Sequence, residues 1–358
     1  MSRPERITYL DVLRGIAIVL MVVNHTSRWW VDVSMGWPRY WLVYGSMLLP
    51  ATIFLFLVGF VLPLPFRDRP LPPLAQAWPN YVRRGLGIVI AGLLLNVIVF
   101  RDEPVYAGGV LQTIGLCVIL TAPGVWIARS HAGRIALLAL AALLYVTFVF
   151  AVPALRTWAA QHVEVARALV YDFPLWPWLA PPLVGVVAGT MWLAARERGP
   201  EAERRFFGIL AAAGVACLIA YDAWEALWPT TPRFGFARDF VLNRHWTPRG
   251  ASLLLIGGSV AILMSLTYWV CEVRRVSLRP LVILGQTAMM LYFLHQVLAY
   301  TLVKEALGWS FHSWSLYWAW NVVLIVVLLG ISKVWLTLRP RLRRGRRPQP
   351  QATAPTAA

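Results

Sequence analysis

The sequence predicts an all-α polytopic membrane protein with about ten transmembrane helices and both termini in the cytoplasm. Of its 358 residues, 59% are apolar and only 14% are charged, whereas a typical soluble domain is about 25% charged. The apolar residues fall in runs close to the roughly 20 residues that a helix needs to cross the hydrocarbon layer. Lysine and arginine collect between alternate runs, which is typical of the cytoplasmic side of a membrane protein. These observations exclude a cytosolic enzyme.

Ten apolar stretches follow one another along the chain. Their approximate bounds are 8–27, 41–62, 84–100, 109–128, 134–153, 175–195, 206–228, 251–271, 281–303 and 315–336. The third is short, and the seventh ends with Asp222 and Glu225. The first is not a cleaved signal peptide, because Asp11 and Arg14 interrupt its apolar run and no small-residue cleavage site follows. We therefore expect it to remain in the protein as a helix.

Positive charge sets the predicted orientation. If the ten stretches alternate in direction, 22 lysine and arginine residues lie on the side of the N-terminus and ten on the other, with Arg14 inside the first helix. Such an excess marks the cytoplasmic side, and nine or eleven spans would scramble it. Residues 1–338 are thus predicted to form one membrane domain. Residues 339–358 are predicted to form a basic and then disordered cytoplasmic tail.

Composition also limits the partners and cofactors. The net charge is +17, but a nucleic-acid reader keeps its cations on a solvated face, so we expect a lipid bilayer and no nucleic acid as the partner. Cys117, Cys217 and Cys271 stand singly, without a CxxC pair or a His/Cys cluster, so neither a disulfide nor a metal site is expected. Many of the 19 tryptophans lie at span ends, among them Trp29, Trp30 and Trp178. This placement is typical of an interfacial belt.

The first stretch contains three ionisable side chains, which are costly inside a membrane and therefore candidates for function. Asp11 and Arg14 are three residues apart and can neutralise each other near the cytoplasmic end. His25 follows Arg14 by eleven residues, about three turns, so both point to one face about 16 Å apart along the axis. A salt bridge that only positions the helix, and an interfacial histidine without a role, are the alternatives.

Two further stretches carry polar groups within apolar sequence. Stretch 281–303 holds Gln286, Tyr292, His295 and Gln296, with Tyr292 and His295 one turn apart on one face. Stretch 109–128 opens with GGVLQTIG, in which Gln112 is the polar member. Such groups face other helices or a wet cavity. Interhelical hydrogen bonding and plain helix packing remain alternatives for them.

Four motifs resemble one known family. The first stretch has the start Leu-Asp-x-x-Arg-Gly and a histidine eleven residues after the arginine, as in the transmembrane acyltransferase superfamily. The segments LLPATIFLFLVGF, GGVLQTIG and GQTAMMLYFLHQ are similar to bacterial relatives of heparan-alpha-glucosaminide N-acetyltransferase. The four motifs occur in the order of that family and span about residues 10–296.

The resemblance implies a ten-helix enzyme that takes an acyl group, usually acetyl, from cytoplasmic acyl-CoA and transfers it to a sugar hydroxyl or amine across the membrane. In lysosomal members an asparagine ends the first motif and a histidine follows in the next loop, but residues 28–40 contain no histidine. His25 instead ends the motif, as in the related type-three acyltransferases. O-acylation and N-acylation, the acceptor and the acyl length therefore stay open.

Acyl transfer from a thioester fits these residues. A base must take the proton of the acceptor, and we assign this role to His25, because an imidazole near neutral pKa suits it. Candidates for hydrogen-bond donors to the developing oxyanion are Asn24, His295, Tyr292 and Gln112.

The acyl-CoA site is assigned to charged groups near the cytoplasmic end. Arg14, paired with Asp11, is expected there together with Arg83 and Arg84, and Gln112 is placed along the same site. For Arg83 and Arg84, ordinary positive-inside residues are the alternative interpretation.

The predicted protein is an acyl-CoA-dependent O- or N-acyltransferase of the bacterial inner membrane. Acetyl-CoA or another acyl-CoA serves as co-substrate, and a carbohydrate is the acceptor. The oligomeric state stays open, and a homodimer is one alternative. A transporter or flippase of a glycan or lipid-linked precursor is the main alternative, because polar residues in broken helices also mark substrate pathways. A structural or partner-binding membrane protein is the other.

Overall fold

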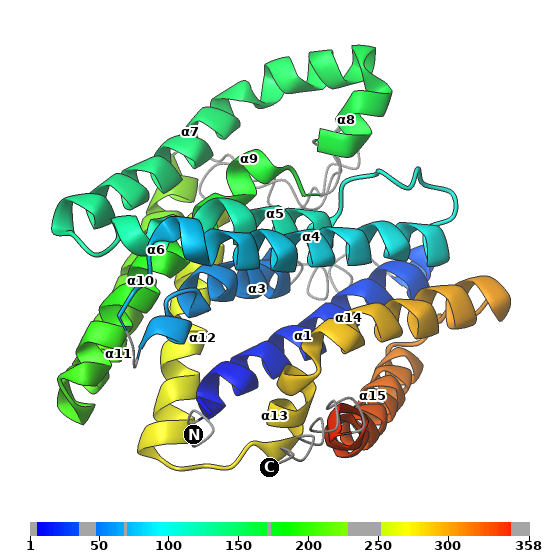
Figure 1. The fold of residues 1–358 in the computed structure, drawn as a ribbon. Coiled ribbons are helices and arrows are strands. Elements are labelled where there is room, and N and C mark those ends of the chain that lie inside the picture. Colours follow the sequence, from blue (N-terminus) through cyan, green and yellow to red (C-terminus); the bar gives the residue numbers. More distant parts are fainter. Residues whose placement is uncertain (1–5, 36–47, 68–69, 170–172, 228–251, 345–358) are drawn as a thin grey trace, which may run out of the picture.

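The computed structural model describes residues 6–35, 48–67, 70–169, 173–227 and 252–344. Within these ranges the regular structure is helical and no strand is found (Figure 1). In chain order the elements are α1 (Thr8–Trp30), η1 (Val33–Met35), α3 (Leu48–Val61), η2 (Leu64–Phe66), α4 (Leu74–Ile98), α5 (Val110–Thr121), α6 (Gly124–Ile127), α7 (His131–Gln161), α8 (Val163–Leu169), α9 (Leu175–Trp178), α10 (Ala180–Glu197), α11 (Pro200–Leu227), α12 (Ser252–Tyr268), η3 (Trp269–Val273), α13 (Arg279–Gln286), α14 (Ala288–Gln296), η4 (Val297–Ala306) and α15 (Trp314–Arg344). The all-α prediction is confirmed.

Each of the ten predicted stretches overlaps a helix of the described residues, but two of them are not simple spans. Eight helices of the described residues are long and apolar enough to cross a membrane. The ninth stretch is a pair, α13 with α14 and η4, bent by 82°. The fourth is the 12-residue helix α5, about 18 Å long and too short to cross alone. It ends at Thr121, two residues before Pro123, whose ring disfavours the preceding helical turn.

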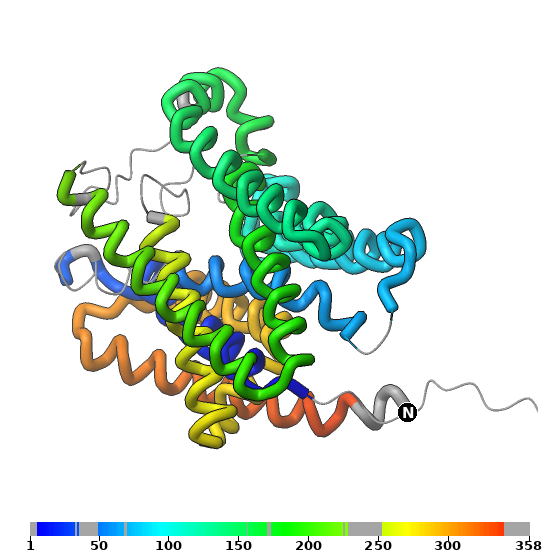
Figure 2. Tube along the Cα trace, turned by 90° about the vertical axis from the view of Figure 1, so that its left-hand side faces the viewer, coloured from blue at the N-terminus to red at the C-terminus, as the bar shows by residue number. Residues whose placement is uncertain are grey.

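Helix α1 is the central element of the membrane domain. It is the most enclosed of the eight spans, and it packs against α3, α12, α13, α14 and α15. Helices α7 and α11 are the least enclosed, and α7 lies far from α1 in both views (Figure 2). Their exposed apolar side chains are the surface that a bilayer covers. The ionisable residues of α1 therefore lie in the protein interior.

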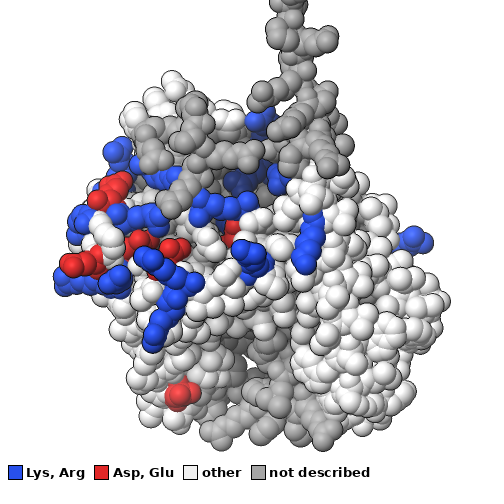
Figure 3. All heavy atoms as spheres, turned by 90° about the horizontal axis from the view of Figure 1, so that it is seen from below, with Lys and Arg blue, Asp and Glu red and all other residues white. Residues whose placement is uncertain are grey.

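Many lysine and arginine side chains lie on the face of the molecule from which α1 begins (Figure 3). Figure 3 looks up at the underside of Figure 1, where α1 begins, and lysine and arginine side chains are spread over that face. This distribution fits the orientation that the sequence predicts. Helix α4 begins at Leu74, ten residues before the predicted start of the third stretch, so Arg83 and Arg84 lie within a helix and not in a loop. Their long side chains can extend toward water from that position.

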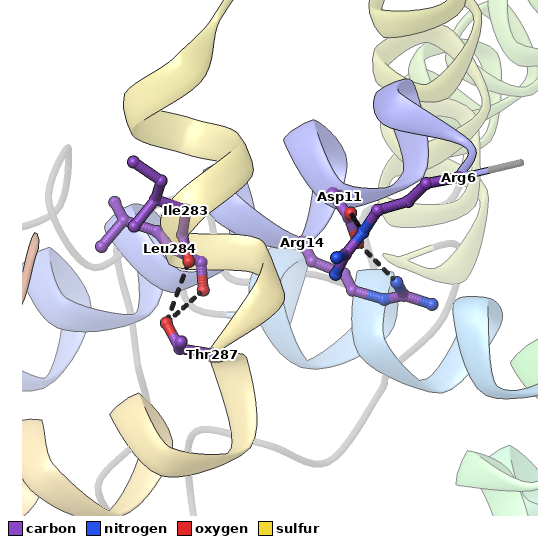
Figure 4. Close-up of polar contacts among 6 residues, drawn as sticks. All are labelled: Arg6, Asp11, Arg14, Ile283, Leu284 and Thr287. Carbon is purple, nitrogen blue, oxygen red and sulfur yellow. Dashed lines mark hydrogen bonds and ion pairs between the residues drawn. The ribbon is translucent and has the colours of Figure 1, made fainter. Parts of the chain in front are cut away.

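The break between α13 and α14 lies at Thr287. Its hydroxyl is 3.0 Å from the carbonyl oxygen of Ile283 and 3.3 Å from that of Leu284 (Figure 4). It is also 2.8 Å from the hydroxyl of Ser332 on α15. The hydroxyl groups thus satisfy polar backbone atoms at the break, as a membrane interior requires.

Two glycines let α13 lie directly on α1. A Cβ atom at Gly15 would lie 2.1 Å from the carbonyl oxygen of Leu281, and one at Gly285 would lie 1.9 Å from that of Asp11. Real Cβ atoms do not approach backbone oxygens so closely. The small residues allow the close backbone contact that holds membrane helices together. The bend then carries α14 along the second half of α1, which brings His295 to His25.

Candidate active site

A cavity of about 300 Å³ lies beside the second half of α1. Helices α1, α3, α4, α5 and α14, the segment 100–109 and η4 all contribute to its wall. Below it is called the outer cavity. Its polar and charged wall residues are Asn24, His25, Arg28, Asn96, Asp102, Glu103, Gln112, Tyr292, Gln296 and Tyr300.

A second cavity of about 320 Å³ lies beside the first half of α1. We call it the inner cavity. Among its described wall residues the charged ones are Arg14 and Arg84, and most of the others are aliphatic. Both cavities share four wall residues, namely Phe54, Leu111, Ile114 and Tyr292. These four side chains form the partition between the two spaces.

His25 and His295 form a hydrogen-bonded pair at the outer cavity. The Nδ1 atom of His25 lies 2.8 Å from the Nε2 atom of His295. Their rings are nearly parallel, with an interplanar angle of 18° and centroids 5.1 Å apart. His295 is fully buried, whereas His25 is partly exposed and belongs to the cavity wall. Helix α1 therefore places the ring of His25 at the cavity wall, and the buried His295 of α14 holds that ring through the hydrogen bond.

The hydrogen bonds determine the tautomer of each ring. The Nδ1 atom of His295 lies 2.8 Å from the carbonyl oxygen of Leu291. A carbonyl can only accept, so this Nδ1 carries the hydrogen and the Nε2 of a neutral His295 is an acceptor. His25 must then donate from its Nδ1, which leaves the lone pair of the neutral ring on its Nε2. A base oriented by a second group is the arrangement that proton abstraction requires.

Side chains on α15 hold the helix turn that carries His25. The hydroxyl of Thr26 lies 2.6 Å from the Oδ1 atom of Asn321, to which it donates. Tyr317 donates to the carbonyl oxygen of Val23 at 2.8 Å. All three polar side chains are buried, so these bonds are shielded from water. They fix the end of α1 against α15.

The other predicted oxyanion donors take different positions. Asn24 is fully buried in the wall of the outer cavity, and neither atom of its amide has a hydrogen-bond partner in the described part of the chain. Gln112 also lines the outer cavity, but its amide nitrogen donates to the carbonyl oxygen of Ala107 at 3.2 Å. Tyr292 borders both cavities, and its ring meets that of His295 edge-on at 5.8 Å. Both ring nitrogens of His295 are hydrogen-bonded already, one to His25 and the other to the carbonyl oxygen of Leu291.

The predicted charged residues separate into two groups. Asp11 is buried and accepts from Arg14 at 3.1 Å, as the spacing predicts, and also from Arg6 at 2.7 Å (Figure 4). Arg14 and Arg84 line the inner cavity. The side chain of Arg83 is exposed, and it lies 3.5 Å from the side-chain oxygen of Asn80. Arg84 is exposed too, but of the two neighbouring arginines it is the one that lines the inner cavity.

Sequence reasoning missed an aromatic cluster at the outer cavity. The ring of Trp29 lies 5.1 Å from those of His25 and Tyr300, and Phe100 lies 5.5 Å from Tyr300. Trp29 had been assigned to the interfacial belt. Its position four residues after His25 was the available signal, because residues at that spacing share one helix face. Gln296 was noticed in its apolar stretch but was not assigned to the site, although it lines the outer cavity.

No group of three His, Cys, Asp or Glu side chains that could hold a metal ion occurs among the described residues. The described groups of the two cavities are two imidazoles, amides, aromatic rings, guanidinium groups and the carboxylates of Asp102 and Glu103. The site offers an oriented base in a partly enclosed space and, across a partition, two cations. The loop 229–250, considered as a cover for the acceptor, lies outside the described residues.

Comparison with known proteins identifies one family. Residues 6–226, more than half of the chain, match the family model described as "Heparan-alpha-glucosaminide N-acetyltransferase, catalytic". No curated protein matches the sequence. The matched range covers α1 to α11 and includes His25, whereas α14 with His295 lies beyond its end.

Proposed function

The chain belongs to the heparan-alpha-glucosaminide N-acetyltransferase catalytic family and is a membrane acetyltransferase, and on this premise we propose its donor, its acceptor and its catalytic groups. The proposed donor is cytoplasmic acetyl-CoA or a similar short acyl-CoA. The proposed acceptor is a hydroxyl or amine of a carbohydrate on the other side of the membrane. The proposed location is a bacterial inner membrane. The observation that carries the proposal is the His25–His295 pair at a cavity wall.

His25 acts as the general base. Its Nε2 takes the proton from the acceptor hydroxyl or amine while the acceptor oxygen or nitrogen attacks the thioester carbonyl carbon. The C–S bond then breaks, the CoA thiolate leaves, and the proton passes from His25 to that sulfur. While His25 is protonated, both of its ring nitrogens are donors, and the lone pair on the Nε2 of His295 accepts from its Nδ1. His295 is a positioning residue that stabilises the cationic base.

The inner cavity supports a site for the donor. CoA is an anion with several phosphate charges, and guanidinium groups bind phosphate through charge-assisted hydrogen bonds. Arg14 and Arg84 supply two such groups. Eleven residues separate Arg14 from His25, a rise of about 16 Å along α1. A long, thin arm is needed to carry a thioester over that distance, and the pantetheine arm of CoA has this shape.

The partition between the cavities marks the proposed place of reaction. Tyr292 and Phe54 border both spaces, so a thioester that reaches them from the inner side arrives next to the outer cavity. The amide of Asn24 is the proposed donor to the oxyanion, since it is buried and has no other partner among the described residues. Such a preoriented donor stabilises charge that develops in the transition state.

The proposal is tested with the full-length protein purified in detergent. Labelled acetyl-CoA and a glycan extract are supplied to the wild type, to His25→Ala and to His131→Ala. His131 is an exposed histidine at the start of α7 and serves as the matched control. We expect transfer by the wild type and the control, and a loss of about 10²–10⁴-fold in His25→Ala. Binding of CoA should persist in that variant. A wild type that binds no CoA and transfers no label would refute the proposal.

The bent pair α13–α14 favours transport as a second candidate function. Discontinuous helices line substrate sites in many transporters. Here the helix pair is bent by 82°, and Tyr292 on its second helix borders both the inner and the outer cavity. Sealed vesicles separate the two functions. An acetyltransferase moves the acetyl label across while CoA stays outside. A flippase carries its whole substrate across, and does so without acetyl-CoA.

A further inference from the structure

We propose that Gln296 determines acceptor specificity by accepting a hydrogen bond from a second hydroxyl or amine of the carbohydrate, beside the one that is acylated. This inference rests on the proposed function. It assigns a role to the last residue of α14, directly after His295. Gln296 ends the motif GQTAMMLYFLHQ and lies beyond the matched family range.

The side chain of Gln296 is buried, and its amide oxygen is unsatisfied within the described part of the chain. Only 1% of the residue is exposed, and its Oε1 atom has no hydrogen-bond partner in the part of the chain that the structure describes. Burying an unsatisfied amide oxygen is unfavourable, because the group loses its hydrogen bonds to water. Helix α14 also passes into the π-helix η4 after Gln296, and π-helical turns are frequent at functional sites. A ligand with an N–H or O–H group would remove this cost.

The position of Gln296 identifies which substrate supplies that group. Gln296 lines the outer cavity together with His25, whereas Arg14 and Arg84 line the inner one. The amides of the pantetheine arm could also donate to an amide oxygen. However, the donor enters through the inner cavity and only its thioester has to reach the partition at Tyr292. The outer cavity remains for the acceptor.

The unsatisfied atom also fits a carbohydrate better than a simple alcohol. A sugar has hydroxyl groups on neighbouring carbons, so one can be acylated while the next donates to Oε1. A site built to hydrogen-bond a hydroxyl rejects analogues that lack it, because its own polar atom is then left unpaired. The same outer wall holds the rings of Trp29, Phe100 and Tyr300, which offer apolar faces to a sugar ring. Gln296 is thus the polar member that distinguishes one sugar position from another.

The test compares the wild type with Gln296→Met, Gln296→Glu and Gln161→Met. Methionine has a similar length but lacks the amide oxygen, and glutamate retains an acceptor oxygen. Gln161 is an exposed residue at the end of α7 and provides the control. The acceptors are methyl α-D-glucoside and methyl α-D-glucosaminide, each with its 2-, 3- and 6-deoxy analogues. The KM for the acceptor and for acetyl-CoA is measured with each protein, and size-exclusion profiles verify the fold.

We expect Gln296→Met to raise the acceptor KM about three- to tenfold, the effect of one lost hydrogen bond, with the KM for acetyl-CoA unchanged. Gln296→Glu should lie closer to the wild type. One deoxy analogue should be poor for the wild type but equal to its parent for Gln296→Met. An unchanged acceptor KM, or a rise in the KM for acetyl-CoA instead, would overturn the inference. A wild type that acylates no acceptor refutes the proposed function itself, and the measurements on the wild type alone reveal this outcome.

Discussion

The Nδ1 atom of His25 lies 2.8 Å from the Nε2 atom of His295, although 270 residues separate them in the sequence. The first belongs to α1 and the second to the outer half of a broken helix pair. Because His295 also donates to the carbonyl oxygen of Leu291, the pair has a direction that leaves the lone pair on the Nε2 of His25. This direction is what suits His25 to a base and His295 to its support.

The first prediction concerns His295. Its replacement by alanine removes the acceptor that orients His25, and we expect kcat to fall about 10–100-fold, because a small misplacement of a catalytic group can cost about 100-fold. His295→Asn offers a side-chain oxygen to the same Nδ1 and should recover part of the rate. The KM for both substrates should change little. Steady-state kinetics of acetyl transfer, with the pH dependence of kcat, checks this.

A purely structural role for His295 would give a different pattern. His295→Ala and His295→Asn would then lose activity in proportion to the amount of folded protein, and the pH profile of the remaining activity would keep its shape. If His295→Ala has the kcat of the wild type, the support role is wrong and His25 is held by its other neighbours.

The second prediction uses two neighbouring arginines. Both arginines are exposed, but Arg84 lines the inner cavity, whereas Arg83 lies near Asn80. Arg84→Gln should raise the KM for acetyl-CoA about tenfold or more, since a hydrogen bond to a charged group contributes about 1.5–3 kcal/mol. Arg83→Gln should change it less than twofold. For the wild type, the KM for acetyl-CoA should also rise with salt concentration, because salt screens the attraction between Arg84 and the CoA phosphates. In Arg84→Gln this attraction is absent, so the rise should be smaller. Equal effects of the two variants would argue against the donor site.

Much of the fold could be predicted because a membrane imposes length and polarity on each span. The ten stretches were found from apolar length alone, and the Asp11–Arg14 ion pair followed from helical spacing. Helix starts were less certain. Helix α4 begins at Leu74, inside a segment whose arginines and prolines lower its apolar character. A hydropathy pattern cannot show that such a segment continues the helix.

The site could be predicted only in part, because contacts between distant helices leave no local pattern. His25 and His295 were each selected as polar groups in apolar runs, but their bond depends on the bend at Thr287 and the close contact at Gly285. The belt interpretation was wrong for Trp30 and Trp178, which are 1% and 0% exposed. Trp30 lies at a helix end, but its indole nitrogen donates to the carbonyl oxygen of Ala299 in the π-helix η4, a partner that sequence cannot reveal.

The third prediction concerns the contact between α1 and α13. Gly285→Ala would place a Cβ atom 1.9 Å from the carbonyl oxygen of Asp11, so the helices must move apart. We expect a loss of about 1–3 kcal/mol in the free energy of unfolding, as for an overpacked core. Gly208→Ala on α11 is the control, because nothing lies within 4 Å of its added Cβ. It should be neutral or slightly stabilising, since alanine favours a helix over glycine.

Thermal unfolding in detergent, followed by tryptophan fluorescence, measures this difference. The apparent Tm of Gly285→Ala should fall by several degrees, and activity should fall even below that temperature, because the bend carries His295. If Gly285→Ala is as stable as Gly208→Ala, α13 does not contact the backbone of α1 as closely as described.

The last prediction concerns the bond between Thr26 and Asn321, which fixes the end of α1 against α15. The two groups are buried and 2.6 Å apart. Thr26→Val should destabilise the protein because it leaves the Oδ1 atom of Asn321 without its donor. Asn321→Leu should also destabilise it, because the Thr26 hydroxyl loses its shortest hydrogen bond and keeps only the longer contacts with Val23 and Tyr317. The double variant should lose less than the sum of the two, with a coupling of about 0.6 kcal/mol and at most about 1.7 kcal/mol, the range found for membrane helices.

Unfolding by sodium dodecyl sulfate measures the coupling, and acetyl transfer measures its effect on the site. Thr147→Val on α7 is the control, because among the described residues the hydroxyl of Thr147 bonds to its own helix and to Trp176 and to nothing on α1 or α15. That control should retain the wild-type kcat. In Asn321→Leu we expect kcat to fall about tenfold or more, since Thr26 adjoins His25 and a displaced helix end moves the base. Strict additivity of the two stability changes, together with an unchanged kcat, would show that α15 holds α1 by apolar packing alone and that Asn321 does not position His25.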